Sequence, residues 1–186
     1  MPSTDETPAT QTLKGAGLPV LYLDYDGPLH NEAVYWDQNT KRPFMRAPER
    51  YWLFQHTPLL EKLMAPHPSI AIVLSTSWVY HYGFRKAARE LPAGLRRRVI
   101  GSTYEAQGSD FLYLSRGEQV ATDVERRRPA HWLALDDDPI GWPGWALPHL
   151  LLADPYEGIS PPDVVDEVRT RLALLASAPG PPRTSS

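Results

Sequence analysis

The chain has 186 residues, a formal net charge of -3 and no cysteine. A single domain of this length buries roughly two thirds of its unfolded surface, so we expect one hydrophobic core. The weakly acidic charge excludes the overall basic surface of duplex-binding proteins, and the lack of cysteine excludes disulfides and thiolate zinc sites.

The two ends of the chain differ in composition from its middle. Residues 1–17 and 179–186 are rich in Pro, Thr, Ser and Gly and have little to bury, so we predict disordered tails around a folded domain at 18–178. No apolar stretch approaches the roughly 18 residues of a membrane span, and the N-terminus lacks the order of a signal peptide. We therefore expect a soluble, cytoplasmic protein with no membrane contact.

Five short apolar runs alternate with stretches of helical periodicity. Nearly continuous apolar character indicates strands that are covered on both faces, as in a parallel sheet. In chain order the runs are 19–25, 69–76, 97–103, 131–137 and 147–154.

Helix signals lie between these runs. Thr57 can cap one helix, residues 117–129 predict a second, and a third starts at Ser160. Strands that alternate with helices predict right-handed crossovers. The fold class is therefore α/β: a three-layer, Rossmann-like domain with a mainly parallel five-stranded sheet.

Acidic or hydroxyl side chains follow three of the predicted strands. They are Asp24 and Asp26, Ser75 to Ser77, and Asp136 to Asp138. Ligands of such sheets bind at the carboxyl ends of the strands. Carboxylates about 4 Å apart in a partly dry site repel one another by several kcal/mol unless a cation lies among them. Oxygen ligands alone favour Mg²⁺ as that cation.

The first of these pairs suits phosphoryl transfer. A carboxylate beside a metal-neutralised phosphoryl group can act as a nucleophile, which is the role we predict for Asp24. Gly27 and Pro28 turn the chain, so Asp26 can protonate the leaving-group oxygen and later activate a water.

Three segments resemble the motifs of the haloacid dehalogenase (HAD) superfamily of phosphotransferases. Asp24-Tyr25-Asp26-Gly27 resembles the first motif, "IVLSTSW" the second and "WLALDDD" the acidic fourth. Over about residues 20–175 the chain is most similar to small HAD domains that are grouped with bacterial RNA-repair proteins. The resemblance implies an HAD-like fold with a minimal cap and Mg²⁺-dependent phosphatase activity.

The resemblance also implies residue roles. Asp24 would be the nucleophile and a metal ligand. Asp26 would be the general acid and base, with its main-chain carbonyl at the metal. Asp136 and Asp137 would hold Mg²⁺, and Asp138 is less suited because the chain already turns there.

The phosphate would be bound by a hydroxyl of the second motif and by a cation. The resemblance assigns the hydroxyl to Thr76, with Ser75 as the alternative. Family members usually place a Lys, sometimes an Arg, before the helix that leads to the fourth motif. Arg116 is the best-placed cation and can offer paired donors to phosphate, while Arg85 and Lys86 are alternatives.

Residues 31–56 are too few for a large cap domain and predict a small flap. Its basic residues alternate with aromatic ones, which suits either a nucleic-acid contact or an ordinary loop over the sheet edge. We expect a phosphorylated substrate, with RNA or DNA ends or nucleotides preferred. The alternatives are a small-metabolite or phosphoprotein phosphatase and a catalytically silent HAD-like binding module. The sequence specifies no oligomeric state.

Overall fold

A wholly parallel sheet of five strands forms the centre of the computed structural model, which describes residues 13–105 and 109–178. The strand order is β5-β4-β1-β6-β7. The strands are β1 (Pro19–Leu23), β4 (Ala71–Leu74), β5 (Val99–Ser102), β6 (His131–Asp136) and β7 (Leu150–Leu152). The predicted α/β class and the mainly parallel five-stranded sheet are confirmed.

The described residues also form six α-helices and two short 3₁₀ helices. The α-helices are α1 (Thr57–Met64), α2 (Ser77–Tyr82), α3 (Phe84–Arg89), α4 (Ala93–Arg96), α5 (Arg116–Arg127) and α6 (Pro162–Ser177). The 3₁₀ helices are η1 (Ser109–Tyr113) and η2 (Leu147–His149). None of these helices has both the length and the apolar character that a membrane crossing needs.

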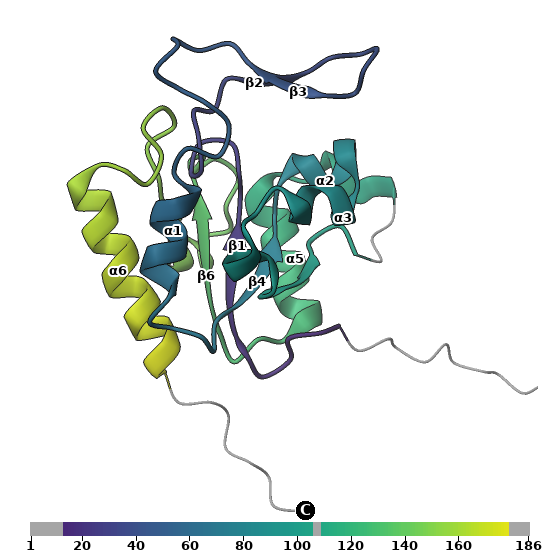
Figure 1. Cartoon of the computed structure of the whole chain (residues 1–186). Helices are drawn as coiled ribbons and strands as arrows, with labels where there is room; N and C mark the ends of the chain where they lie inside the picture. The colour runs from purple at the N-terminus through teal and green to yellow at the C-terminus, as the bar shows by residue number, and fades with distance from the viewer. Residues whose placement is uncertain (1–12, 106–108, 179–186) are drawn as a thin grey trace, which may run out of the picture.

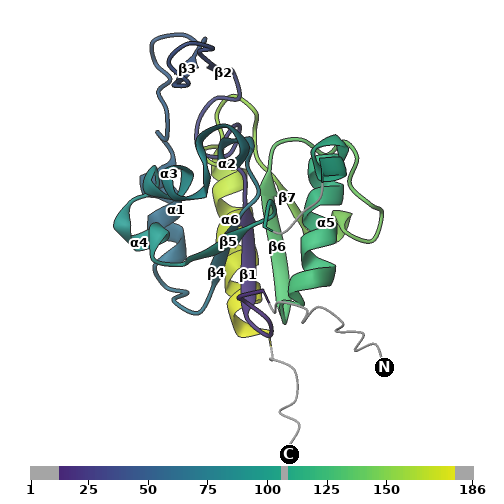
Figure 2. The ribbon, with the colours of Figure 1, turned by 90° about the vertical axis from the view of Figure 1, so that its right-hand side faces the viewer.

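The helices cover both faces of the sheet. Figure 1 shows α1 and α6 on one side of β1 and β6, and α5 on the other. Figure 2, the view turned by 90°, places α3 and α4 near α1, away from α5. In β1, Leu21 and Leu23 pack into the core under α1 and α6, whereas Val20 and Tyr22 pack into the core under α5. All four are buried, because successive strand side chains point to opposite covered faces.

The chain changes direction across the sheet after β5. From β1 it runs outward through β4 to β5, and it then returns to β6 on the other side of β1. In an open α/β sheet this switch point is where ligands bind, at the carboxyl ends of the strands. The ends of β1, β4 and β6 therefore lie side by side.

The start of α1 differs from the sequence prediction. Thr57 is the first residue of the helix, and His56, already in the right-handed helical region, occupies the N-cap position. The Thr57 hydroxyl is buried and has no hydrogen-bond partner in the described part of the chain. Thr57 therefore does not cap the helix, because the backbone turns one residue earlier.

A small antiparallel hairpin lies within the predicted flap, residues 31–56. Its strands are β2 (Val34–Trp36) and β3 (Pro43–Met45), and Figure 1 shows it beyond the carboxyl ends of the sheet. On its inner face Trp36 packs edge-on against Trp78, with ring centroids 5.2 Å apart. The hairpin therefore forms a cover over part of the sheet edge and no separate domain.

Residues 13–17 form a turn, although we expected them to belong to a tail. The N–H of Gly17 donates to the carbonyl of Arg128 (3.0 Å), and the guanidinium of Arg127 donates to the carbonyl of Lys14. The rest of the predicted tails, residues 1–12 and 179–186, lie outside the described residues.

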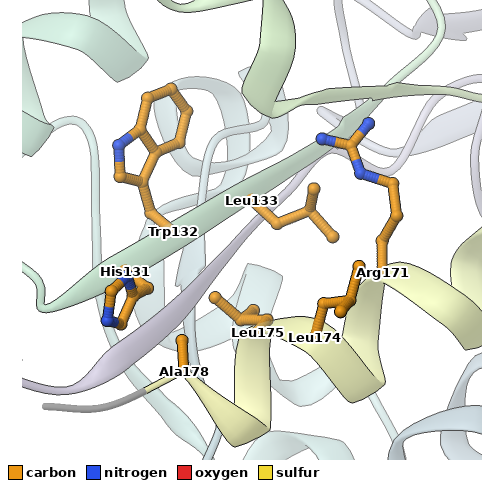
Figure 3. Close-up of a pocket in the computed structure, with 7 residues that line it drawn as sticks. All are labelled: His131, Trp132, Leu133, Arg171, Leu174, Leu175 and Ala178. Carbon is orange, nitrogen blue, oxygen red and sulfur yellow. The ribbon is translucent and has the colours of Figure 1, made fainter.

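A cavity of about 210 Å³ lies between β6 and α6 (Figure 3). His131, the first residue of β6, lines one wall, and Arg171 and Leu174 of α6 line the other. The carboxyl end of β6 is at the opposite edge of the sheet, so this cavity is separate from the predicted site.

A buried ion pair within α5 is linked to the sheet by a hydrogen bond from Tyr22 of β1. Arg127 donates from Nε to Oδ2 of Asp123 (2.6 Å) and from an Nη to Oδ1 (3.0 Å). The hydroxyl of Tyr22 donates to the same Asp123 carboxylate at 2.8 Å. All three side chains are buried. Removing one partner of such a pair leaves an uncompensated charge in the core.

We expect Arg127→Leu to lower the free energy of unfolding by about 3–5 kcal/mol, because Asp123 would remain buried without its cation. Urea unfolding followed by circular dichroism measures the change. Arg126→Leu is the matched control, since Arg126 is exposed on the same helical turn. An equal loss of unfolding free energy in the two variants would contradict a stabilising role of the buried ion pair.

Candidate functional site

Three carboxylates converge at the carboxyl ends of β1 and β6. Leu23 pairs with Leu135 in the sheet, so Asp24 and Asp136, each one residue further on, lie next to each other. With Asp137 they form a group in which one carboxylate oxygen from each residue lies within 4.8 Å of the others. Among the described residues, no other set of His, Asp or Glu forms such a group.

The three carboxyl groups resist ionisation in this arrangement. Burial raises the pKa of Asp24, and the charge of Asp26 raises it further against the opposing effect of Arg116. Burial and the neighbouring charge of Asp24 also raise the pKa of Asp136 well above its ordinary value. The same two causes, burial first, raise the pKa of Asp137 to about 7. A bound cation would favour the charged forms.

Two further features fit a hard divalent cation. Oδ2 of Asp136 is buried and accepts no hydrogen bond from the described residues. Gly27 has a φ of 83°, and a Cβ built on it would lie 2.2 Å from Cγ of Asp137. Glycine is therefore needed where the first turn approaches this carboxylate. Oxygen ligands at such a site suit Mg²⁺.

The predicted metal ligands are thus brought together, with one distinction. The side chains of Asp24, Asp136 and Asp137 make up the acidic group, and the carboxylate of Asp26 lies outside it. Only the main-chain carbonyl of Asp26 would then coordinate the metal, as the family resemblance implied. Asp138 is exposed, and its carboxylate accepts from the N–H of Ile140 at 2.8 Å.

Arg116 provides the positive charge of the site. It begins α5, where Ser115 caps the helix in a capping box with Glu118. Its Nε lies 3.5 Å from Oδ2 of Asp24 and 3.9 Å from Oδ2 of Asp136. Burial opposes its charge, but the two carboxylates outweigh burial and raise the pKa of the guanidinium.

The alternative cations lie elsewhere. Arg85 and Lys86 are exposed on α3, and Nζ of Lys86 lies 5.3 Å from the ring centre of Tyr82. Of the cations weighed from the sequence, Arg116 is the one paired with the acidic group.

The two hydroxyls after β4 differ in their partners. Thr76 caps α2 by accepting from the N–H of Trp78 at 3.4 Å, and its hydroxyl lowers the pKa of Asp24 against the effect of burial. Ser75 lies beside Asp24, because Leu74 pairs with Leu23. Its hydroxyl is buried and has no partner in the described residues. Ser75 therefore has the free hydroxyl, although sequence comparison favoured Thr76.

Asp26 is held by two residues to which sequence reasoning gave no role. Its Oδ1 accepts from the indole N–H of Trp78 at 2.8 Å and lies 3.0 Å from Nε2 of His30. His30 follows Asp26 by four residues across the turn at Gly27. That spacing in the sequence is compatible with a contact, but a contact with Trp78, 52 residues away, requires the assembled sheet.

In EDTA at pH 8, we expect Asp137→Asn to raise the free energy of unfolding by about 1 kcal/mol. The carboxyl group is ionised above its pKa of about 7, so the burial of its charge, together with repulsion by Asp24, destabilises the fold as pH rises through that value. The variant should lose most of the thermal stabilisation that Mg²⁺ gives the wild type. Thermal unfolding with and without Mg²⁺ measures both effects. Asp138→Asn is the control, and a full Mg²⁺ effect in Asp137→Asn would contradict the assigned ligand.

Comparison with known families agrees with this arrangement. The family model that describes the HAD domain in Swiss Army Knife RNA repair proteins matches residues 20–164, which contain every site residue discussed above. Searches of curated proteins and of solved structures gave no match. The family match confirms the resemblance that the three sequence motifs indicated, and the parallel sheet agrees with it. The chain belongs to the family of HAD domains in Swiss Army Knife RNA repair proteins.

Proposed function

We propose that this domain hydrolyses phosphate monoesters through an aspartyl-phosphate on Asp24. The observation that carries the proposal is the convergence of Asp24, the acidic partners Asp136 and Asp137, and Arg116 at one sheet edge. A buried acidic group with a paired arginine matches the needs of a phosphoryl group. Membership of an HAD family supports hydrolase chemistry at this position.

In the first step a carboxylate oxygen of Asp24 attacks phosphorus. The bond from phosphorus to the ester oxygen breaks, and the carboxyl group of Asp26 donates its proton to the departing oxygen. The products are the free alcohol and the aspartyl-phosphate, with Asp26 left as a carboxylate.

In the second step the Asp26 carboxylate acts as the base. It takes a proton from a water that attacks phosphorus, and the bond from phosphorus to the Asp24 oxygen breaks. Inorganic phosphate leaves, Asp24 is again a carboxylate and Asp26 is again protonated.

The remaining side chains bind and orient the phosphoryl group. Arg116 can donate from its guanidinium once the substrate is present, and Ser75 has a hydroxyl free to donate. Mg²⁺ held by Asp24, Asp136 and Asp137 would neutralise charge on the phosphoryl oxygens. With the cation in place, the ionised form of the nucleophile is favoured.

We propose phosphorylated nucleic-acid ends or nucleotides as the substrate class. Two observations support it. The family is described by its occurrence in RNA repair proteins. The hairpin beyond the carboxyl ends of the sheet carries two exposed aromatic side chains, Tyr35 and Phe44. The guanidinium of Arg46 lies 5.1 Å from the ring centre of Tyr35 and 5.4 Å from that of Phe44. Aromatic and arginine side chains of this kind stack on bases.

We expect Asp24→Asn to lower phosphate release by at least about a thousandfold, because the amide keeps the shape of the side chain and loses the nucleophile. The assay compares p-nitrophenyl phosphate with oligonucleotides phosphorylated at the 3′ or the 5′ end, with Mg²⁺ and with EDTA. Circular dichroism establishes that the variant is folded. Release that survives in Asp24→Asn would disprove the aspartyl-phosphate route.

The same assay decides the substrate class. A higher kcat/KM for one phosphorylated oligonucleotide than for small phosphate esters supports a nucleic-acid end, whereas the reverse order indicates a small-molecule phosphatase. A folded wild type that binds Mg²⁺ but releases phosphate from no substrate would favour a binding module instead.

We expect Ser75→Ala to lower kcat/KM by about 10- to 100-fold, because a hydrogen bond to a charged phosphoryl oxygen is lost. Steady-state kinetics on the best substrate measures the loss. Ser77→Ala, two residues along the same segment, is the matched control and should retain wild-type kinetics. If Thr76→Val, which keeps the shape of the side chain and removes its hydroxyl, is impaired more than Ser75→Ala, Thr76 is the phosphate ligand after all.

A further inference from the structure

We propose that His30 and Trp78 are positioning residues that hold Asp26 by one oxygen and leave its other oxygen for proton transfer. This inference rests on the proposed phosphatase function. It concerns how Asp26, outside the acidic group of Asp24, Asp136 and Asp137, is kept in one orientation.

Two N–H groups converge on the same atom of Asp26. The indole Nε1 of Trp78 donates to Oδ1 at 2.8 Å, and Nε2 of His30 lies 3.0 Å from that same oxygen. Oδ2 takes part in no hydrogen bond found among the described residues. The carboxyl group therefore has one anchored oxygen and one available oxygen.

The main chain selects the tautomer of His30 that makes this possible. Nδ1 of His30 accepts from the N–H of Phe54 at 3.1 Å. Since Nδ1 is an acceptor, the ring proton of the neutral imidazole is on Nε2, which then donates to Asp26. Phe54 has a φ of 63°, a conformation that costs a residue with a side chain about 1 kcal/mol or more and that persists only where the surroundings impose it.

Aromatic packing imposes that conformation. The Phe54 ring contacts His30 with centroids 4.9 Å apart and Trp78 with centroids 5.0 Å apart. Trp36 of the hairpin adds a further edge-on contact with Trp78. The two donors are thus packed between the body of the domain and the hairpin, and neither ring can turn without disrupting its neighbours.

The exposure of the three side chains distinguishes the positioning residues from the residue that can reach a substrate. Both His30 and Trp78 have a relative exposure of 0%, whereas the Asp26 side chain is 26% exposed. The two rings therefore act on the substrate only through Asp26. A carboxyl group that must give a proton and then take one benefits from a fixed direction, because proton transfer requires hydrogen-bond geometry in both steps.

Leaving-group dependence tests this role. An alkyl oxygen, as in a nucleic-acid end, needs a proton as it departs, whereas p-nitrophenolate does not. Trp78→Phe keeps the packed ring and removes its N–H. We expect it to lower kcat/KM about 10- to 100-fold for a phosphorylated oligonucleotide and by less than about threefold for p-nitrophenyl phosphate. The parameter kcat/KM reports only the steps up to departure of the leaving group, so the later water attack does not obscure the comparison.

Three variants make the comparison specific. Trp132→Phe is the matched control, because Trp132 is also buried in the core but lies in β6 beneath α5. It should change neither substrate's kcat/KM. His30→Gln can keep an N–H near the position of Nε2 and should retain more oligonucleotide activity than His30→Met, which cannot. Asp26→Asn should show the same dependence on leaving group as Trp78→Phe.

A second measurement does not depend on turnover. In ¹⁵N spectra of the folded protein, Asp26→Ala should shift the indole N–H signal of Trp78 and the ring N–H signal of His30 and should speed their exchange with solvent. The indole signal of Trp132 should stay in place. Unchanged Trp78 and His30 signals would overturn the proposed contacts whatever the activity.

The outcomes separate the two proposals. If Trp78→Phe lowers kcat/KM equally for both substrates while Asp24→Asn abolishes turnover, the phosphatase proposal stands and the positioning role is wrong. If the folded wild type releases no phosphate from any substrate, the phosphatase proposal fails, and the positioning role fails with it even where the N–H signals respond to Asp26→Ala. Selective loss on the oligonucleotide, together with the shifted signals, supports the proposal.

Discussion

The register of three adjacent parallel strands is the constraint on which this molecule depends. Leu23 of β1 pairs with Leu74 of β4 on one side and with Leu135 of β6 on the other. The residue that follows each of these leucines therefore places its side chain in the candidate site. These residues are Asp24, Ser75 and Asp136. A shift by one residue in either pairing would send these side chains to opposite faces of the sheet. The buried apolar residues of the strands thus fix the geometry of the polar edge.

The buried charges of the molecule are concentrated around α5. At its first residue, Arg116 pairs with Asp24 and Asp136, which offsets the unfavourable position of a cation at a helix N-terminus. At its last residue, Arg127 pairs with Asp123 beneath the sheet. The Arg116 ion pairs and the hydrogen bond from Tyr22 of β1 to Asp123 therefore connect the two ends of α5 to the sheet. Arg116 is consequently held in place by contacts at both ends of its helix.

The hairpin lies beyond the candidate site and also contacts a residue that holds one of its carboxylates. Trp36 contacts Trp78, and Trp78 donates to Asp26. Phe54, which closes the flap segment, fixes the proton of His30 through its main-chain N–H. The flap segment, residues 31–56, is therefore linked to the candidate site by the Trp36 ring and by the main-chain N–H of Phe54.

The sequence by itself determined the sheet and most of the acidic site. Strands buried on both faces are continuous apolar runs, and a carboxylate after such a run must emerge at the sheet edge, so Asp24, Asp136 and Asp137 were recognisable from local pattern. Arg116 was recognisable from the family resemblance, which places a cation just before the helix that leads to the fourth motif. Only the tertiary structure showed that the Ser75 hydroxyl has no partner among the described residues, ordered residues 13–17 against Arg127, and brought Trp78 and His30 to Asp26. These outcomes depend on which hydroxyl is already hydrogen-bonded and on contacts between residues far apart in the chain, and the packing of the whole domain sets both.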